Sequence, residues 1–296
     1  HNKYEAYGAH VDDSVNFQVY NKQNQTPETV AAVDETKGQV LSYKGDIIET
    51  YYYSTSYGHT GDYEAWNLDK DAYGYLQGVW VRSEENPIDL SDEKSFLDYI
   101  SNVDSACYES DLKYFRWNTV LDFQGKDETL LHTIADRKEH QPEAISYYKD
   151  ASKTEKTDSC SNFGSLQAIK VVKRNQSGVI LELELDFQNG AVSVQSEYNM
   201  RAILGCGITN INLLDGSSVE MSILPSAYIS IQAKGDGTYA VLGGGYGHGI
   251  GMSQNGAQKL CGQGFDYKRI LNYFYQDTEL TELYQPQNMT KEEGGA

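Results

Sequence analysis

The chain has 296 residues, 39% of them hydrophobic, and a formal net charge of −19. That length and apolar content are enough to bury the core of one or two compact domains. No stretch is basic enough to compete for phosphates, so nucleic acid is excluded as a partner. No run reaches the ~18–20 apolar residues of a membrane span, so no span is expected in this chain.

Cysteine and histidine give no sign of a metal site. Cys107, Cys160, Cys206 and Cys261 are far apart in the sequence and form no CxxC pair, so a zinc ribbon is not expected. An even count permits two disulfides in an exported protein, and buried free thiols are an equal alternative. The six histidines have no HxH or HExxH spacing. We therefore predict no metal and no cofactor.

The first predicted elements are a hairpin and a polar loop. Val40–Tyr43 is predicted to be a strand, residues 44–46 a turn, and Ile47–Ser54 a returning strand. The next residues, Ser54–Trp66, lack apolar periodicity and predict an ordered polar loop. Its polar side chains suit a polyhydroxylated substrate, but self-satisfied Ser/Thr turns are the favoured alternative. These side chains are Ser54, Thr55, Ser56, His59 and Thr60.

An acidic segment follows, between about residues 83 and 161. Asp92–Asn102 is predicted to be a helix because its apolar residues have helical spacing, and Glu128–Lys138 is a second helix candidate. Asp150–Ser161 predicts a solvated loop and the edge of a subdomain.

Strand signals dominate the remainder of the chain. Three β-rich runs separated by turns predict an antiparallel meander, and two more predict a hairpin. Two helices are predicted near the end, at Ser253–Cys261 and Asp266–Tyr275. The fold class is α+β, with mostly antiparallel strands and short helices around a substrate groove. The predicted strands are 168–174, 179–187, 191–195, 227–233 and 238–244.

The stretch GGGYGHGIGMSQNGAQ, from Gly243 to Gln258, has glycine at seven of its sixteen positions. It joins a strand to a helix, so it is not a free linker, and it lacks the context of a phosphate loop. Bare backbone would let His248 project toward a ligand, and its near-neutral pKa suits acid–base work. Ser253 can cap the helix that follows. A structural histidine that bonds the loop to itself is the equal alternative.

The run GYGHGIGMSQNGAQKLCGQGFDYKRILNYFYQDTEL resembles the C-terminal signature of the stage II sporulation protein D family, also described as amidase enhancers. Earlier segments are similar to family blocks in the same order, so the resemblance covers most of the chain. It is weakest around residues 91–110. The similar segments are VDDSVNFQVY (Val11–Tyr20), ETKGQVLSYKGDIIETYYYSTS (Glu35–Ser56), FRWNTVL and MRAILG.

The resemblance implies a peptidoglycan lytic transglycosylase that acts on glycan strands stripped of stem peptides. In such chemistry a carboxylic acid of raised pKa protonates the glycosidic oxygen, and O6 of muramic acid attacks C1 to give a 1,6-anhydro product. The implied location is extracytoplasmic, in the wall or as a membrane-anchored ectodomain of an endospore-forming Gram-positive bacterium.

The chain departs from the family pattern in three places. The family's catalytic Glu lies in a helix similar to EALKAQAVAARTY, and that motif is absent from this sequence. We therefore expect no catalytic residue here, with the Glu upstream of His1, removed by truncation rather than never present. The Cys and His with which some members bind zinc are missing from Val11–Tyr20. The family's STSGG-T reads STSYGHT, with Tyr57 in place of a glycine.

These observations define the predicted site, partners and domains. The expected partner is the glycan strand of peptidoglycan; the alternative is a non-enzymatic amidase enhancer or glycan-binding module that recruits a partner amidase. We divide the chain into core residues 1–83, an inserted acidic and partly helical subdomain 84–161, a β-rich core 162–285 and a disordered tail 286–296. The predicted substrate-binding or supporting residues are Ser54, Thr55, Ser56, Thr60, Tyr246, His248, Ser253 and Gln254.

Overall fold

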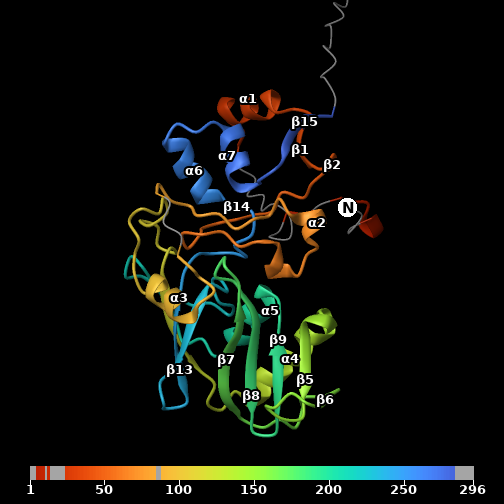
Figure 1. Cartoon of the computed structure of the whole chain (residues 1–296), viewed down its shortest axis with the longest axis vertical. Helices are drawn as coiled ribbons and strands as arrows, with labels where there is room; N and C mark the ends of the chain where they lie inside the picture. The colour runs from red at the N-terminus through yellow and green to blue at the C-terminus, as the bar shows by residue number, and fades with distance from the viewer. Residues whose placement is uncertain (1–4, 11, 14–23, 85–87, 284–296) are drawn as a thin grey trace, which may run out of the picture. The chain divides into compact units, whose positions relative to one another are not determined.

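A computed structural model describes residues 5–10, 12–13, 24–84 and 88–283 (Figure 1). The chain divides into one compact unit of residues 1–41 and 280–296 and a second of residues 42–279. Most of VDDSVNFQVY and the predicted tail 286–296 lie outside the described residues. The first unit contains the short 3-10 helix η1 (Glu5–Tyr7) and helix α1 (Pro27–Glu35). The strands β1 (Gln39–Tyr43) and β15 (Glu279–Glu282) cross the boundary between the units.

The larger unit is built on two five-stranded sheets whose strand pairs are all antiparallel. The first sheet has the order β6-β5-β9-β8-β7, and the second has the order β11-β10-β4-β13-β12. The fold class predicted from the sequence, α+β with mostly antiparallel strands, is confirmed. The strands of the first sheet are β5 (Ile145–Tyr148), β6 (Lys156–Thr157), β7 (Leu166–Arg174), β8 (Ile180–Phe187) and β9 (Gly190–Val194). Those of the second are β4 (Trp117–Asp122), β10 (Ile211–Leu213), β11 (Ser218–Val219), β12 (Ile229–Ala233) and β13 (Thr238–Gly243).

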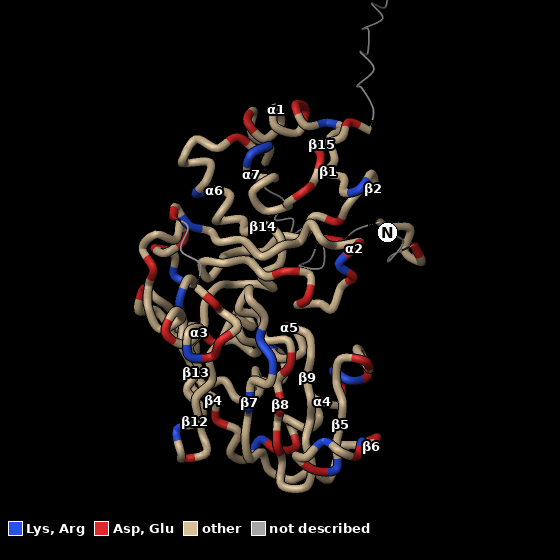
Figure 2. Tube along the Cα trace, viewed as in Figure 1, with Lys and Arg blue, Asp and Glu red and all other residues tan. Residues whose placement is uncertain are grey.

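The predicted meander is present as β7, β8 and β9, and the predicted hairpin as β12 and β13. In β8 the registers Val171↔Leu183 and Leu183↔Val194 set three apolar side chains across neighbouring strands, where such cross-strand pairs stabilise a sheet. The carboxylate of Glu184 on the same strand is 2.7 Å from the Nζ of Lys153 and 3.0 Å from that of Lys170. Lys and Arg are interspersed with Asp and Glu along this sheet (Figure 2).

One apolar core joins both sheets to two helices, α4 (Asp127–His140) and α5 (Glu197–Gly205). The helices contribute Leu130 and Ile203, among others, and the sheets contribute Val192 and Val241. Both helices lie beside the strands of the first sheet in Figure 1. This core fixes the frame on which the loops of the candidate site are held.

The helices of the larger unit include four that the sequence predicts and three short ones that it does not. The predicted helices at Asp92–Asn102, Glu128–Lys138, Ser253–Cys261 and Asp266–Tyr275 are confirmed, with ends that differ by a few residues. They are α3 (Glu93–Ile100), α4, α6 (Gln254–Gly262) and α7 (Tyr267–Phe274). The others are η2 (Tyr63–Trp66), α2 (Lys70–Tyr73) and η3 (Pro142–Ala144).

The returning strand predicted at Ile47–Ser54 is wrong as a continuous element. Only β2 (Asp46–Ile47) pairs with β1, and β3 (Tyr52–Tyr53) pairs in parallel with β14 (Met252–Ser253). The reason is a competing partner, because the Tyr51 carbonyl accepts hydrogen bonds from the Met252 N–H (3.0 Å) and the Tyr275 hydroxyl (2.6 Å). The segment therefore leaves its hairpin to meet the glycine-rich stretch.

The division at residues 83 and 161 stays a prediction. The structure adds that β4, from the range 84–161, is hydrogen-bonded between β10 and β13 of the range 162–285.

Two valines of the first sheet, one buried and one exposed, test whether the buried side chains stabilise the larger unit. Val192 is fully buried in β9, whereas the side chain of Val172 in β7 is 47% exposed. We expect Val192→Ala to lower the free energy of unfolding by about 2 kcal/mol, because it removes buried methyl groups and leaves a cavity. Val172→Ala is the matched control and should cost less than about 0.5 kcal/mol in chemical denaturation. Equal losses in the two variants would contradict this description of the core.

Candidate functional site

The glycine-rich stretch lies directly against the polar loop of residues 54–61. The backbones of Thr55 and Tyr246 exchange two hydrogen bonds (3.1 and 2.8 Å), and the Gly61 N–H donates to the Gly249 carbonyl at 2.6 Å. Gly249 has a φ of +81°, and a Cβ there would lie 2.2 Å from the Tyr228 ring. A Cβ at Gly251 would lie 2.1 Å from the Tyr51 carbonyl oxygen. The glycines are therefore required by close packing of backbone against neighbouring segments.

The imidazole of His248 connects this stretch to β3. Its Nε2 is 2.8 Å from the Tyr52 carbonyl, and its Nδ1 accepts the Ile250 N–H at 3.1 Å. A carbonyl only accepts and Nδ1 accepts here, so the ring is neutral with its proton on Nε2. Burial lowers the pKa of His248 below its usual value, which also favours the neutral ring. These contacts fit the structural alternative, in which the histidine bonds the loop to itself; a role in orienting substrate stays a prediction.

The five predicted serine and threonine residues are brought together, but four of them are inside the protein. Exposed fractions are 2% for Thr55, 1% for Ser56 and 0% for both Thr60 and Ser253. The Thr60 hydroxyl accepts the Val79 N–H at 2.9 Å. These residues therefore support the loop, and direct contact with substrate remains a prediction for them.

The other predicted residues are placed as follows. Ser253 caps α6 as predicted, since its hydroxyl accepts the Gly256 N–H at 3.1 Å. Ser54 is half-buried, and its carbonyl accepts from the Asn255 amide at 3.0 Å. Tyr246 is half-buried and stacks on Tyr114 at 4.4 Å between ring centroids. Gln254 is exposed at the first position of α6.

A carboxyl group that sequence reasoning missed lies at the centre of this arrangement. Glu109 is fully buried, and its Oε1 accepts from the Ser56 N–H (3.0 Å) and from the Ser253 hydroxyl (2.7 Å). Its Oε2 is hydrogen-bonded to the Ser56 hydroxyl. Burial raises the pKa of Glu109 to about 7, although the hydroxyl and N–H donors pull it down. Glu109 thus joins the polar loop to the start of α6.

The sequence signal for Glu109 is weak. It stands in CYESDLK, within the acidic segment where the family resemblance is least clear, and nothing local distinguishes it from a solvated glutamate. Because the carboxyl is fully enclosed, Glu109 is a positioning residue rather than one that meets a ligand.

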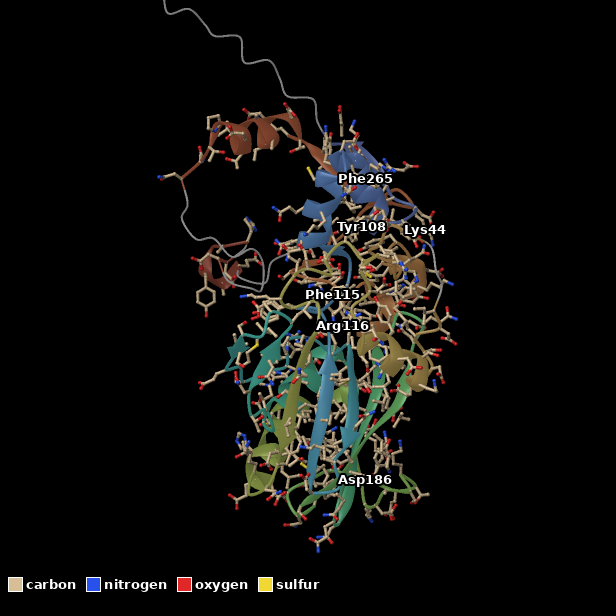
Figure 3. The ribbon with its side chains drawn as sticks, turned by 90° about the vertical axis from the view of Figure 1, so that its left-hand side faces the viewer. Lys44, Tyr108, Phe115, Arg116, Asp186 and Phe265 are labelled. Atoms are coloured by element: carbon tan, nitrogen blue, oxygen red, sulfur yellow. The ribbon has the colours of Figure 1, made fainter. Side chains whose placement is uncertain are left out.

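Arg116, which is labelled in Figure 3, also holds the polar loop. Its NH1 donates to the carbonyls of Tyr57 (2.8 Å) and Phe115 (2.9 Å), and its Nε donates to that of Asn102 (2.8 Å). Tyr57 is itself fully buried and stacks on Tyr228 at 4.4 Å between ring centroids. The loop is therefore fixed by hydrogen bonds and packing along most of its length.

A polar groove of about 900 Å³ opens beside this loop. The aromatic side chains in its wall are Tyr43, Tyr63 and Trp80, and the carboxylates are Asp62, Asp71, Asp89 and Asp277. His59, from the polar loop, and Gln77 also line it. Burial raises the pKa of Asp62, whose carboxylate accepts from Ser177 Oγ at 2.6 Å and from the Asn175 amide. The groove combines flat rings with many hydrogen-bonding groups, as sites for polar ligands do.

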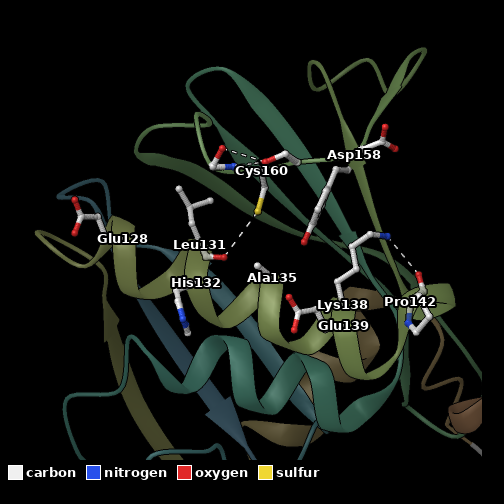
Figure 4. A pocket seen from close by; sticks show the side chains of 12 residues that line it. Glu128, Leu131, His132, Ala135, Lys138, Glu139, Pro142, Asp158 and Cys160 are labelled. Atoms are coloured by element: carbon white, nitrogen blue, oxygen red, sulfur yellow. Dashed lines mark hydrogen bonds between the residues drawn. The ribbon is translucent and has the colours of Figure 1, made fainter.

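A second cavity, of about 600 Å³, lies between α4 and residues 158–161 (Figure 4). Leu131, Ala135 and Tyr147 supply apolar surface, and Cys160 Sγ is 3.8 Å from the Leu131 carbonyl oxygen. It shares no lining residue with the polar groove. None of the predicted site residues lines it.

All four cysteines are free thiols, so the disulfide alternative is not what the structure contains. Within the described ranges, no group of three His, Cys, Asp or Glu side chains is arranged to hold a metal ion. Over the same part of the chain, none of the helices has the length and apolar character needed to cross a membrane.

Comparison with known proteins gives the chain relatives. A family model described as "Domain of unknown function (DUF8618)" matches residues 58–251. The chain is 26% identical over 288 residues to the amidase enhancer of Bacillus subtilis (strain 168), covering 93% of this chain and 35% of the relative. It is 23% identical over 288 residues to stage II sporulation protein D of the same strain, covering 93% of this chain and 61% of the relative.

Stage II sporulation protein D of Bacillus amyloliquefaciens is likewise 23% identical over 290 residues, covering 93% of this chain and 60% of the relative. The chain thus spans about a third of the amidase enhancer and about three-fifths of each sporulation protein. The family resemblance seen in the sequence is confirmed, at low identity.

The variant Glu109→Gln tests the raised pKa of the buried carboxyl through the pH dependence of stability. The folded protein holds the proton of the Glu109 carboxyl more tightly than the unfolded chain does, because the pKa of this carboxyl is near 4.5 in the unfolded chain and about 7 in the folded protein. The stability that Glu109 contributes is therefore complete below pH 4.5 and is lost as the pH rises to about 7. Relative to Glu109→Gln, the wild-type free energy of unfolding should fall by about 3 kcal/mol across that interval.

Comparing the wild type with Glu109→Gln separates the effect of Glu109 from that of His59. Burial lowers the pKa of His59 to about 4, so His59 makes the protein more stable, not less, as the pH rises. The amide can still accept from Ser253 and Ser56, so the variant should fold. Parallel stability curves for the two proteins between pH 4.5 and pH 7 would contradict the assignment.

Proposed function

This chain belongs to the family described as a domain of unknown function (DUF8618), and from its similarity to the amidase enhancer and to stage II sporulation protein D, together with the polar groove, we propose that it binds the glycan strands of peptidoglycan. In the fuller proposal it takes part in their cleavage as a lytic transglycosylase of the sporulation protein D type, releasing 1,6-anhydro products. We place this activity in the cell wall of a Gram-positive bacterium, in sporulation or wall remodelling. The names of the relatives support the association with sporulation and the wall.

The groove is the observation that carries the proposal. Pyranose rings pack their C–H faces on aromatic side chains, and their hydroxyls pair with carboxylates and amides. Tyr63 and Trp80 offer such rings, while Gln77 and Ser177 offer neutral polar groups. His59 and Ser177 pack tightly against Gly78. A Cβ added at Gly78 would lie 2.8 Å from His59 Cε1 and 2.1 Å from Ser177 Oγ. A groove held this tightly is preorganised for a ligand.

Cleavage needs a carboxylic acid that reaches the glycosidic oxygen. Glu109 is enclosed, and Asp62 has its carboxylate occupied by donors from Ser177, Asn175 and the Glu64 N–H. We therefore assign neither of these two carboxyls as the proton donor, and the catalytic Glu expected from the family resemblance stays a prediction. The chain's own part in the reaction is to bind and orient the strand.

The second candidate function is that of a non-enzymatic amidase enhancer. The name of the relative with 26% identity supports it, and the same groove would then tether a partner amidase to its substrate. The two proposals share glycan binding and differ in whether any anhydro-sugar product is released.

Glycan strands stripped of stem peptides provide the test. We expect the chain to bind them, and Tyr63→Ala to weaken binding about tenfold, since an aromatic contact contributes about 1–1.5 kcal/mol. Tyr198→Ala is the control, because Tyr198 is 46% exposed on α5 and does not line the groove. Isothermal titration calorimetry gives affinities, and mass spectrometry of the supernatant detects products.

No binding of stripped strands would contradict the proposed function. Binding that is unchanged by Tyr63→Ala would contradict the groove as its place. Release of 1,6-anhydro products by this chain alone would support the transglycosylase and overturn the expectation that it has no catalytic residue.

A further inference from the structure

We infer that the polar groove selects glycan strands in which an amino sugar has a free, protonated amine rather than an N-acetyl group. This inference rests on the proposed function and names the chemistry of its ligand. It is carried by the excess of hydrogen-bond acceptors and negative charge in the groove, and by the Nε2 of His59, a largely buried residue in the groove wall, which no described residue contacts by a hydrogen bond.

The charges of the groove favour a cation. Four aspartates line it, against two lysines, Lys44 and Lys70. The Lys44 ammonium is already engaged, because it donates to the Asp71 carbonyl at 2.9 Å and lies 3.9 Å from the Asp71 carboxylate. An excess of carboxylates over lysines in a concave site focuses a negative potential and attracts cationic ligands.

Two of these carboxylates keep an oxygen for a ligand. Asp89 accepts the Ser91 N–H (3.0 Å) and hydroxyl (2.6 Å) through Oδ1 alone. Asp277 accepts the Gln77 amide at 3.3 Å through Oδ2 alone. Among the described residues, neither second oxygen receives a hydrogen bond. Each is an acceptor that a bound ammonium would satisfy.

His59 supplies the independent observation. Its side chain lies in the groove wall yet the residue is only 7% exposed, and its Nδ1 is 2.6 Å from the Thr60 carbonyl. Since a carbonyl only accepts, Nδ1 has the proton and Nε2 has a lone pair. No described residue donates to that Nε2. Burial lowers the pKa of His59 to about 4, so the ring stays neutral and remains an acceptor at physiological pH.

An acceptor-rich groove needs a ligand rich in donors. A protonated 2-amino group offers three N–H donors and a positive charge, whereas an N-acetyl group offers one N–H, a carbonyl that competes for donors, and no charge. The diamino acid of a stem peptide also has an ammonium. The rings of Tyr63 and Trp80 in the same groove favour the flat face of a sugar instead.

Short oligosaccharides test the inference directly. We expect a fully deacetylated glucosamine tetramer to bind at least tenfold more tightly than the N-acetylated tetramer in calorimetry at pH 6 and low salt. The preference should fall below threefold in His59→Asn, whose amide can still donate to Thr60 but lacks the Nε2 acceptor. It should also fall in the double variant Asp89→Asn and Asp277→Asn. Glu220→Gln, which removes an exposed charge outside the groove, should keep it.

The controls separate this inference from general attraction to an acidic chain. Tetralysine that binds as tightly as the deacetylated tetramer, and equally in all variants, would overturn the inference. Equal or tighter binding of the N-acetylated tetramer would also overturn it while leaving the proposed function intact. Failure of both tetramers and of stripped glycan strands to bind would instead overturn the proposed function itself.

Discussion

The carboxyl group of Glu109 is the interaction on which the arrangement of the loops depends. It accepts from Ser56 in the polar loop and from Ser253 at the start of α6, two segments that are nearly 200 residues apart in the sequence. A buried carboxyl is costly unless it is hydrogen-bonded or neutral; Glu109 is hydrogen-bonded, and burial raises its pKa in the direction of the neutral form. Removing either the Ser56 or the Ser253 donor would leave the buried Glu109 carboxyl with an unsatisfied oxygen. The polar loop and the start of α6 therefore depend on each other for their positions.

Burial drives the ionisable groups around these loops toward their neutral forms. It raises the pKa of Glu109 to about 7 and lowers that of His59 to about 4 and that of His248. Directional hydrogen bonds in a low-dielectric interior then hold the loops in one geometry. Asp89 and Asp277 line the neighbouring groove, where they would meet the proposed ligand. A rigid, hydrogen-bonded frame beside a groove rich in carboxylates suits recognition of a polar chain.

Local patterns in the sequence predicted the elements whose stability is local. The alternation in β8 and the glycine-containing turns gave the meander, and the spacing of Ile270 and Phe274 gave the face that α7 buries. The broken strand after Ile47 was not predictable, because its partner is the distant Met252. The role of the glycines also needed the structure, since the neighbours that exclude a Cβ come from residues such as Tyr228 and Tyr51. The predicted hydroxyls were found together, but Glu109, which joins them, has no sequence signature.

Fold alone does not establish an activity, and the groove is the feature of this chain that would recognise a glycan. Its geometry depends in turn on the loop that Glu109 holds, so the state of that carboxyl is the most direct test. The measurement is a ¹³C NMR titration of side-chain carboxyls in glutamate-labelled protein, with Glu109→Gln to assign the signal. We predict one carboxyl that titrates near pH 7 and is missing in the variant. If Glu109 titrates at or below its usual value near 4.5, the buried, hydrogen-bonded acid at the centre of this account is contradicted.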